Sequence, residues 1–527
     1  MSASIKSPSP AAPDDVTSPS GGDVLIVGAG MGGLAAALRL SALGLAVTVV
    51  EKGPLPGGKI QQLNSPLGPI DLGPTVCTMR WVFDELLSAS GSGFDELVSA
   101  EPLEVIAHHR WPDGSRLDLH ADPERTREAI GRFAGVAELR RHDRFLAMAA
   151  ALYRSLEDAY LRAAEPSLTG LLRRTGLAGL LAVGRAQPFT SLWRRLGQCL
   201  RDQRLRQLYA RYATYCGSSP LDAPATLMLI AHVERQGVWR IEGGMARLAR
   251  ALADAARSRG VRFLFSEPVE TVMVRSGRAS GIRLGTGEEL HARAVVLNGD
   301  VRALRDGGLG VQAQSAVRAS EVGRRSLSAV TWAGVAPLVS SGLQHHNVFF
   351  SPDYPAEFDA LFRRGRLPAD PTVYLCAADR PREDGTTFKD ERLFLLINAP
   401  ANGDRTDFDA AACLAEGASH AGATLERCGL RVNLDAADLC TSTPGDFHRL
   451  FPATGGALYG AATHGWRAAF ARSGCRSRLP GLYLAGGSVH PGPGVPMAAL
   501  SGLAAAQCVA ADIGALPAAT RRRFTHA

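Results

Sequence analysis

Three observations from the first 51 residues predict an α/β fold. The β-branched run 24–27 predicts a buried strand, and an Ala- and Leu-rich stretch predicts a helix over about 31–43. A second apolar run, 46–50, ends on the acid Glu51. The turn between the first strand and the helix carries three glycines in Gly-x-Gly-x-x-Gly spacing: Gly28, Gly30 and Gly33. A strand, a glycine-rich turn, a helix and a second strand closed by an acid form a Rossmann-like unit that binds dinucleotides.

The chemistry of a bound dinucleotide explains each of these residue types. Gly28 permits the tight turn, Gly30 lets the backbone approach a pyrophosphate, and Gly33 lets helix and strand pack closely. The helix N-terminus presents free N–H groups and the positive end of its dipole to the phosphates. Glu51 can accept hydrogen bonds from both ribose hydroxyls, and an acid there disfavours a 2′-phosphate. The unit therefore predicts NAD or FAD rather than NADP.

The composition indicates a globular protein with an excess of positive charge. The chain has 527 residues, of which 46% are hydrophobic and 21% are charged, and this length suits two or three domains. A formal charge of +7 favours binding to an anionic membrane surface or to a nucleic acid. The sequence contains no nucleic-acid-binding motif, so we expect no nucleic-acid partner.

Cysteines, histidines and apolar runs do not indicate a metal site, a disulfide framework or a membrane span. The nine cysteines lack Cys-x-x-Cys spacing, which fits a reducing cytoplasm. Four histidines without the paired spacing of metal ligands predict surface or core roles: His345, His346, His448 and His464. No apolar run reaches the roughly 18 residues of a transmembrane helix. Residues 1–22 are rich in Ser, Pro and Ala and predict a disordered tail rather than a signal peptide.

Two segments after Glu51 resemble those of known flavoproteins. Gly57-Gly58-Lys59 resembles the second glycine pair of the large FAD-containing oxidoreductase and amine-oxidase superfamily. Asp71-Leu-Gly73-Pro74-Thr75 resembles the D-x-G-P-T segment of phytoene-desaturase-type bacterial carotenoid desaturases. Its continuation, Thr-Met-Arg80-Trp-Val-Phe-Asp84, looks most like the hydroxyneurosporene desaturases, which are 1-hydroxycarotenoid 3,4-desaturases. The resemblance implies FAD rather than NAD, held in part by Gly58 and Lys59.

The end of the chain resembles the flavin-contacting signature of the same desaturases. Residues 481–497 predict a strand and a Gly/His/Pro loop, followed by a helix over 496–513. The resemblance implies cofactor contacts from four residues: the backbone of Val269 at the adenine, and Gly486, Gly487 and Val495 at the flavin. Gly487-Ser488 stands where many amine-oxidase relatives carry an acid, so no carboxylate is assigned to the ribityl chain. Asn298-Gly-Asp300 resembles the family's strand that ends in Asn-x-Asp.

The remaining segments predict how the chain is divided. A hairpin is expected at 105–119 around a Pro-Asp-Gly turn, and apolar strands are expected at 372–377 and 393–397. We expect an α/β architecture, α+β overall, with an FAD-binding domain, a substrate domain, a helical membrane-associating region and two tails. The FAD-binding domain comprises 23–85, 226–301 and 478–515, and the substrate domain comprises 86–120 and 302–477. The helical region is 121–225, and the tails are 1–22 and 516–527.

The helical region contains an acid-free stretch that predicts contact with a membrane lipid surface. No Asp or Glu occurs from Ser167 to Arg201, while Leu, Phe and Trp alternate with arginines. Apolar anchors beside a purely basic face fit a helix that lies in a lipid interface. The alternative is a core-packed insert whose arginines face water. Farther along, three tyrosines at 209, 212 and 215 either line an apolar tunnel or belong to the core.

Arg80 is the candidate selector of substrate. Relatives that desaturate hydrocarbon carotenoids commonly carry proline in its place, and the segment is expected near the flavin and the substrate channel. A guanidinium there needs a partner. That partner is either Asp84, four residues on along a helix, or the tertiary hydroxyl of a 1-hydroxycarotenoid. Both alternatives are open at this point.

The resemblance implies an FAD-dependent carotenoid desaturase that introduces a C3–C4 double bond into acyclic 1-hydroxycarotenoids such as 1-hydroxyneurosporene. FAD would carry the hydride step, so no catalytic side chain is assigned. We expect oxygen or a quinone as electron acceptor, and a cytoplasmic protein that is peripheral on the inner membrane. The alternatives are a phytoene or neurosporene desaturase, a carotenoid isomerase or saturase, an amine oxidase, and a non-catalytic prenyl-binding escort module.

Overall fold

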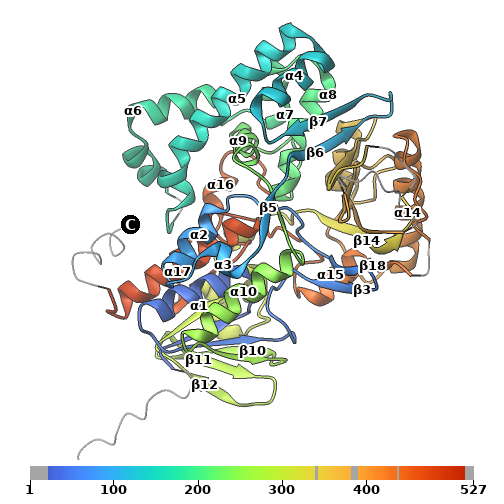
Figure 1. Ribbon diagram of the computed structural model, residues 1–527. Helices are drawn as coiled ribbons and strands as arrows, with labels where there is room; N and C mark the ends of the chain where they lie inside the picture. The colour runs from blue at the N-terminus through green and yellow to red at the C-terminus, as the bar shows by residue number, and fades with distance from the viewer. Residues whose placement is uncertain (1–21, 166, 339–341, 381–389, 436–437, 517–527) are drawn as a thin grey trace, which may run out of the picture.

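A computed structural model describes residues 22–165, 167–338, 342–380, 390–435 and 438–516 (Figure 1). The tails expected at 1–22 and 516–527 therefore lie almost wholly outside the described residues.

A five-stranded parallel sheet is built around the predicted βαβ unit. Strand β1 (Val24–Val27), helix α1 (Met31–Ala42) and strand β2 (Val47–Glu51) confirm the predicted bounds to within one residue. The strand order is β19 (Leu482–Leu484), β13 (Ala294–Leu297), β1, β2 and β9 (Arg262–Phe265). Val27 pairs with both Val50 and Leu297, so the three central strands end together at one edge. Ligands bind at this carboxyl edge in open α/β sheets.

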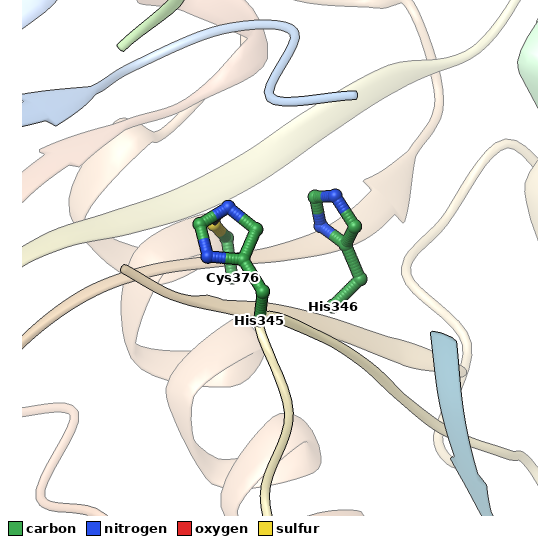
Figure 2. Close-up of side chains that lie close together, drawn as sticks. All are labelled: His345, His346 and Cys376. Atoms are coloured by element: carbon green, nitrogen blue, oxygen red, sulfur yellow. Dashed lines mark hydrogen bonds between the residues drawn. The ribbon is translucent and has the colours of Figure 1, made fainter. Parts of the chain in front are cut away.

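A seven-stranded sheet forms beside this unit. Its order is β18 (Cys440–Ser442), β14 (Ser328–Ala336), β17 (Glu391–Ala399), β16 (Val373–Ala377), β15 (His346–Phe349), β6 (Val105–Arg110) and β7 (Arg116–His120). The predicted hairpin at 105–119 is confirmed as β6 and β7, and β6 runs parallel to β15. Helix α14 (Ala410–Arg427) packs on this sheet. Pairing of β15 with β16 places His346 opposite Cys376, with His345 beside them (Figure 2).

A helical region lies on the side of the molecule away from the small sheet β10–β12 (Figure 1). It comprises α4 (Pro123–Ala134), α5 (Val136–Leu156), α6 (Leu168–Ala186), α7 (Leu192–Cys199), α8 (Gln203–Ala210) and α9 (Ile230–Arg235). The expected N-cap is confirmed, since Asp122 accepts a hydrogen bond from the Glu124 N–H and Pro123 opens α4. Helix α6 is bent at Gly176, where φ is 62° and ψ is −178°. The acid-free stretch therefore contains two helical segments within α6, one on each side of Gly176, and the separate helix α7.

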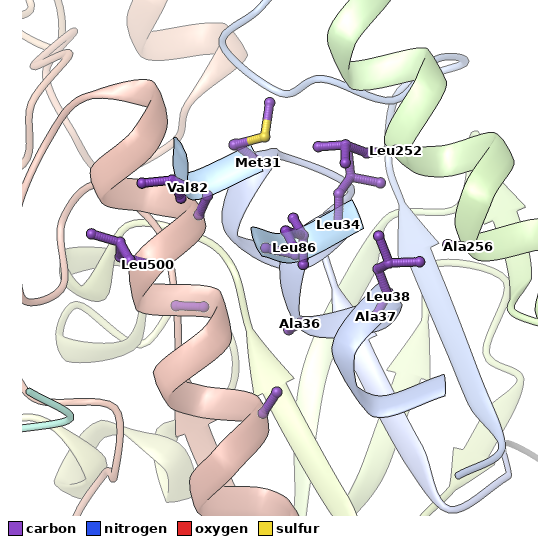
Figure 3. Packing of buried hydrophobic residues seen from close by; sticks show 14 of the residues in the cluster. Met31, Leu34, Ala36, Ala37, Leu38, Val82, Leu86, Leu252, Ala256 and Leu500 are labelled. Carbon is purple, nitrogen blue, oxygen red and sulfur yellow. The ribbon is translucent and has the colours of Figure 1, made fainter. Parts of the chain in front are cut away.

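The parallel sheet is the middle of three layers. One face carries the antiparallel sheet of β10 (Val269–Arg275), β11 (Arg278–Leu284) and β12 (Glu289–His291), and Leu25 and Val50 share a cluster with Ile282. The other face carries α1, α10 (Met245–Ser258) and α17 (Val495–Asp512), as Figure 3 shows. A Cβ at Gly502 would lie 2.0 Å from the Gly32 carbonyl oxygen, so α17 and α1 approach too closely for any side chain there.

Helix α17 corrects one expectation, because no apolar run of membrane-spanning length was predicted. Its 18 residues have a mean hydropathy of 1.3, which makes it the one described helix long and apolar enough to cross a membrane. However, 67% of it is buried in the structure, mainly against α1. Core helices commonly meet the same length and composition criteria.

Shorter elements complete the described chain. They are β3 (Gln62–Ser65), β4 (Gly68–Asp71), α2 (Trp81–Ser88), α3 (Phe94–Leu97), β5 (Ala100–Pro102), η1 (Glu157–Leu161), η2 (Arg211–Cys216), η3 (Ala225–Leu229), β8 (Trp239–Ile241), α11 (Val301–Arg305), η4 (Val311–Ala316), α12 (Ala319–Val322), α13 (Tyr354–Asp359), η5 (Ala360–Arg364), α15 (Pro444–Leu450) and α16 (Ala468–Ala471).

Candidate functional site

One cavity of about 1030 Å³ begins at the carboxyl ends of β1, β2 and β13 and extends between the seven-stranded sheet and the helical region. The structure brings nine of the predicted site residues into its wall: Gly28, Gly30, Glu51, Gly58, Lys59, Val269, Gly486, Gly487 and Val495. These residues come from three distant parts of the chain. Gly33 and Arg80 do not line the cavity.

The glycine-rich turn is organised by Asn298, at the end of β13. Its side-chain amide donates a hydrogen bond to the Gly28 carbonyl oxygen over 3.1 Å. A Cβ at Gly30 would lie 2.9 Å from the same amide nitrogen, so a side chain at Gly30 would collide with Asn298. A Cβ at Gly33 would lie 2.1 Å from the Gly28 carbonyl oxygen. Gly33 therefore serves the packing of helix on strand, as its position in the motif predicts.

The Glu51 carboxylate is fixed at the cavity wall by backbone donors. Its Oε2 accepts from the Ala29 N–H at 2.7 Å, and its Oε1 accepts from the Gly53 N–H at 2.8 Å. A carboxylate has about four lone-pair sites, so two stay open toward the cavity. This arrangement suits a ligand that presents two neighbouring hydroxyls.

Lys59 brings a buried positive charge to the opposite wall. Its ammonium donates to the Leu458 carbonyl oxygen and lies 5.2 Å from the centre of the Phe451 ring. Burial lowers the pKa of Lys59, while the Asp300 carboxylate raises it. Asp300 also lines the cavity. An anionic ligand between them would relieve the cost of burying Lys59.

The loop before α17 closes the same end of the cavity. The Gly486 N–H donates to the Ser501 hydroxyl at 2.7 Å, which ties the loop to the helix. Arg472 donates to the carbonyl oxygens of Ala461 and Gly487. Ser488 belongs to the Gly487-Ser488 pair that stands where many amine-oxidase relatives carry an acid. Its hydroxyl accepts from the Val301 N–H and donates to the Gly299 carbonyl oxygen. Serine therefore joins the C-terminal loop to the end of β13.

Comparison with known proteins places the chain in a family. Residues 31–332 match the family described as flavin containing amine oxidoreductase. The hydroxyneurosporene desaturase of Rubrivivax gelatinosus is 49% identical over 93% of this chain and 93% of its own length. The chain belongs to the flavin-containing amine oxidoreductase family.

Two further comparisons support this assignment. The hydroxyneurosporene desaturase of Cereibacter sphaeroides is 42% identical over 93% of this chain and 98% of its own length. Putrescine oxidase bound to putrescine is 16% identical, with a TM-score of 0.59 over 94% of this chain and 99% of that chain. At that identity the likeness concerns the fold alone, and it confirms the predicted α/β architecture.

FAD is the cofactor of this flavin-containing family member, and the cavity residues fit it. The α1 N-terminus and the side-chain-free wall at Gly30 and Gly58 suit a pyrophosphate. Glu51 suits the ribose hydroxyls, and Val269 lies on the wall with its neighbours Glu267 and Pro268. Asn298 belongs to a segment that resembles the family's strand ending in Asn-x-Asp, but it was not predicted as a site residue. Its position at the carboxyl end of a strand beside β1 is the signal that identifies it.

Arg80 does not reach the cavity, which argues against the selector hypothesis. Its guanidinium donates to Asp84 at 3.3 Å and to Asp95 at 2.5 Å, and stacks on the Phe94 ring at 4.5 Å. Its neighbours Thr78 and Met79 line the cavity instead. The open alternative of an internal partner is therefore the observed one. The backbone carries this segment past the cavity, and Arg80 points to the other side.

The far end of the cavity is apolar. It is lined by Leu168, Leu171, Leu172, Leu180, Val183 and Phe189. Leu168, Leu172 and Phe189 are also exposed at the protein surface. The cavity therefore opens beside α6, among side chains that suit a long hydrocarbon.

The cavity also has a polar section, which we call the polar end of the tunnel: Thr75, Arg211, Tyr215, Glu234, Tyr354 and Tyr374. Arg211 donates to the Tyr215 hydroxyl at 3.0 Å, and Tyr215 donates to Glu234 at 2.8 Å. Burial raises the pKa of Glu234, while the hydroxyls of Tyr212 and Tyr215 lower it. Thr75 and Tyr374 hydroxyls are hydrogen-bonded at 2.6 Å.

The three tyrosines at spacing three divide between the two predicted roles. Tyr215 lines the cavity, whereas Tyr209 and Tyr212 are buried in the core. Tyr209 bonds His142 at 2.6 Å, and Tyr212 donates to Glu234 at 2.5 Å. The helix ends at Ala210 and continues as the 3₁₀-helix η2, in which side chains three residues apart align. The three rings therefore follow one another from the core to the cavity, with neighbouring ring centres 5.8 Å and 5.5 Å apart.

Three buried side chains that sequence spacing did not connect lie close together (Figure 2). Possible ligand atoms of His345, His346 and Cys376 lie within 4.8 Å of one another. His345 Nε2 is 3.6 Å from Cys376 Sγ, and His346 Nδ1 is 2.7 Å from the Tyr374 hydroxyl. Two ligands of one zinc ion lie about 3.3–3.8 Å apart, given metal–ligand bonds of 2.0–2.3 Å, and the His345–Cys376 pair has this spacing. His346 Nδ1 is engaged by the Tyr374 hydroxyl and orients it.

Proposed function

We propose that the protein is an FAD-dependent carotenoid desaturase that forms the C3–C4 double bond of acyclic 1-hydroxycarotenoids. The observation that carries this proposal is the single cavity, which joins the nucleotide-binding glycines to an apolar channel open at the surface. The relatives named hydroxyneurosporene desaturase, at 49% and 42% identity along nearly the whole chain, support the same reaction.

The reaction removes two hydrogens from neighbouring carbons and leaves a double bond between them. FAD, when bound, accepts one of them as a hydride, and the other leaves as a proton. Gly30, Glu51 and Lys59 would hold the cofactor, and the apolar side chains of the channel would enclose the hydrocarbon. Exclusion of water there favours transfer to the cofactor over side reactions.

Product mass tests this function. Holoenzyme incubated with 1-hydroxyneurosporene should yield a product that has lost two hydrogens, with the new double bond between C3 and C4. A product of unchanged mass would instead indicate an isomerase, and a gain of two hydrogens would indicate a saturase. A primary amine offered in place of the carotenoid should not be oxidised, which separates this activity from that of the amine oxidases of similar fold.

We also propose that the protein docks on the cytoplasmic face of the inner membrane through an apolar patch at the channel mouth. The patch is defined by Leu168, Leu172, Leu177, Leu181 and Phe189, which are five of the nine exposed large apolar side chains among the described residues. Exposed arginines flank it: Arg173, Arg174, Arg185 and Arg194. Such a surface suits anionic lipid. A carotenoid could then enter from the bilayer without crossing water.

The patch is smaller than the acid-free stretch from Ser167 to Arg201, which was expected to contact lipid. Trp193 is half-buried, 3.7 Å from the Arg206 guanidinium and 6.1 Å from the Tyr354 ring. Leu180 faces the cavity. These two side chains belong to the interior, so lipid contact is assigned to the patch alone.

A further inference from the structure

The polar end of the tunnel is unusual for a channel that encloses a hydrocarbon. Arg211, Tyr215 and Tyr354 line the same cavity as the apolar side chains of α6. Polar groups removed from water cost free energy unless they are hydrogen-bonded. A ligand that consisted of hydrocarbon alone would leave such groups without partners.

Arg211 is the positively charged group of this section, and its guanidinium retains free donors. Among the described residues the guanidinium makes one hydrogen bond, from Nη1 to the Tyr215 hydroxyl. A guanidinium has five N–H donors, and Arg211 lines the cavity. The guanidinium carbon also lies 5.3 Å and 5.4 Å from the ring centres of Tyr215 and Tyr374. These contacts hold the group in place and leave donors for a ligand.

Glu234 balances the charge and fixes the orientation of Arg211. It accepts from Tyr212 and Tyr215, so the Tyr215 hydroxyl donates its one hydrogen bond to the carboxylate and can only accept from Arg211. Glu234 is therefore a positioning residue. The arrangement leaves Arg211 as a pure donor toward the cavity.

Tyr354 supplies the complementary group. Its hydroxyl is buried and, within the described part of the chain, has no hydrogen-bond partner. Burial raises the pKa of Tyr354 well above its usual value, while Arg211 lowers it. The hydroxyl is therefore neutral and can both donate and accept.

We propose that Arg211 and Tyr354 form the subsite that binds the tertiary C1 hydroxyl of the substrate. The hydroxyl oxygen accepts from Arg211, and its proton is donated to the Tyr354 oxygen. This inference rests on the proposed function and names the residues that select its substrate class. It assigns to this pair the selection that the sequence had suggested for Arg80.

The position of the subsite agrees with the bond that reacts. C1 is separated from C3 by a single carbon, so a group that holds the C1 hydroxyl must lie close to the reacting carbons. The Thr75–Tyr374 hydrogen bond joins the polar end to the segment that follows the cofactor-binding glycines. Anchoring the hydroxyl would set which carbon pair is presented for reaction.

Binding to the reduced holoenzyme tests the subsite without turnover. The probes are 1-hydroxyneurosporene and the same 1,2-dihydro chain without the hydroxyl, each delivered in liposomes. The natural protein should bind the hydroxylated carotenoid about 10- to 100-fold more tightly, as expected for a hydrogen bond to a charged group. Tyr354→Phe and Arg211→Met should each lose most of this ratio, and Arg211→Lys should recover part of it.

Tyr153→Phe is the matched control. The Tyr153 hydroxyl is also buried without a hydrogen-bond partner among the described residues, but it does not line the cavity. The Tyr153→Phe variant should show the same ratio of affinities for the two carotenoids as the natural protein. A 1-methoxy carotenoid, which cannot donate to Tyr354, gives a measurement on the unmutated chain and should bind more weakly than the alcohol.

The proposal is overturned if the natural protein binds the two carotenoids equally. It is also overturned if Tyr354→Phe and Arg211→Met, with FAD still bound, keep the natural ratio. A protein that discriminates through both residues yet removes no hydrogens when oxidised would support the subsite and contradict the proposed desaturation.

Discussion

At the scale of single residues, Gly30 and Asn298 show how an absent side chain makes the cofactor site. Gly30→Val should abolish FAD binding, because its Cβ would lie 2.9 Å from the Asn298 amide and its methyls would enter the space of the pyrophosphate. The measurement is the flavin absorbance that remains with the protein after gel filtration.

Gly422→Val is the matched control for that variant. Gly422 lies in α14, away from the cavity, and no neighbouring atom lies within 4 Å of its added Cβ. This variant should retain a full complement of flavin. Retention of FAD by Gly30→Val would mean that the pyrophosphate approaches another part of the wall.

Asp71 predicts a pH-dependent stability. Its Oδ2 accepts from the Met245 N–H at 2.8 Å, its Oδ1 is buried without a partner among the described residues, and burial raises its pKa from 3.8 to about 6. The folded protein then holds this proton more tightly than the unfolded chain between about pH 4 and 6. The contribution of Asp71 to stability therefore falls as pH rises through that window, by at most about 3 kcal/mol.

Asp71→Asn should remove this dependence. The melting temperature of the variant, relative to the natural protein, should be higher at pH 7 than at pH 4. Glu416→Gln, at an exposed position on α14, is the control. Its difference in melting temperature from the natural protein should be the same at pH 4 and pH 7. A pH-independent difference for Asp71→Asn would show that the carboxylate titrates as it does in water.

Residues that depend on local backbone shape were predictable, whereas those that meet across the fold were not. Gly28, Gly30 and Glu51 follow from the order of strand, turn and helix. Arg211 and Tyr354 come from η2 and α13, and only the folded chain brings them together. Arg80 was assigned to the cavity because its segment passes there. Sequence does not show to which side of that segment a side chain points.

At the scale of elements, α6 predicts how the protein meets a membrane. Replacing Leu172, Leu177 and Leu181 with Ser should release the holoenzyme from anionic liposomes, because these exposed side chains would lie in the lipid interface. Co-sedimentation measures binding, and flavin absorbance confirms that the variant is folded.

An equal loss of exposed apolar surface elsewhere is the appropriate control. Leu67, Val136 and Val311 are also exposed but lie outside α6, and their replacement with Ser should leave liposome binding unchanged. If the α6 variant still sediments with anionic vesicles, another surface of the protein is the anchor.

Helices and strands were predicted correctly where the hydrophobic periodicity of one short segment was sufficient. The βαβ unit and the hairpin of β6 and β7 formed within a residue or two of their predicted bounds. Sequence periodicity does not indicate that β6 would pair with β15, more than 200 residues away. The bend at Gly176 was missed because glycine is common in small-residue helices, and only its φ of 62° identifies the break.

At the scale of the whole molecule, the fold brings both ends of the chain to one ligand. The cavity wall combines the glycine-rich turn after β1 with the loop before α17, more than 450 residues later. Family resemblance predicted this return of the chain to the FAD-binding domain; composition and periodicity did not. The seven boundaries between the predicted segments stay predictions, since a cavity shared by all parts does not define where one domain ends.

The same architecture predicts how the reduced cofactor is reoxidised. The Gly28–Gly33 turn joins β1 to α1 at the cavity and accounts for one dinucleotide. A soluble nicotinamide cofactor would need a second such site beside the flavin. The channel mouth lies instead among the exposed apolar side chains of α6, which would face lipid. We therefore expect one FAD per chain and direct reoxidation by oxygen or by a quinone from the bilayer.

Holoenzyme reduced anaerobically by 1-hydroxyneurosporene in liposomes should regain its oxidised flavin spectrum when either acceptor is added. The α6 variant should respond to oxygen as before but more slowly to a lipid-dissolved quinone. Turnover that required NAD⁺ or NADP⁺ would contradict this prediction and would point to a second nucleotide site.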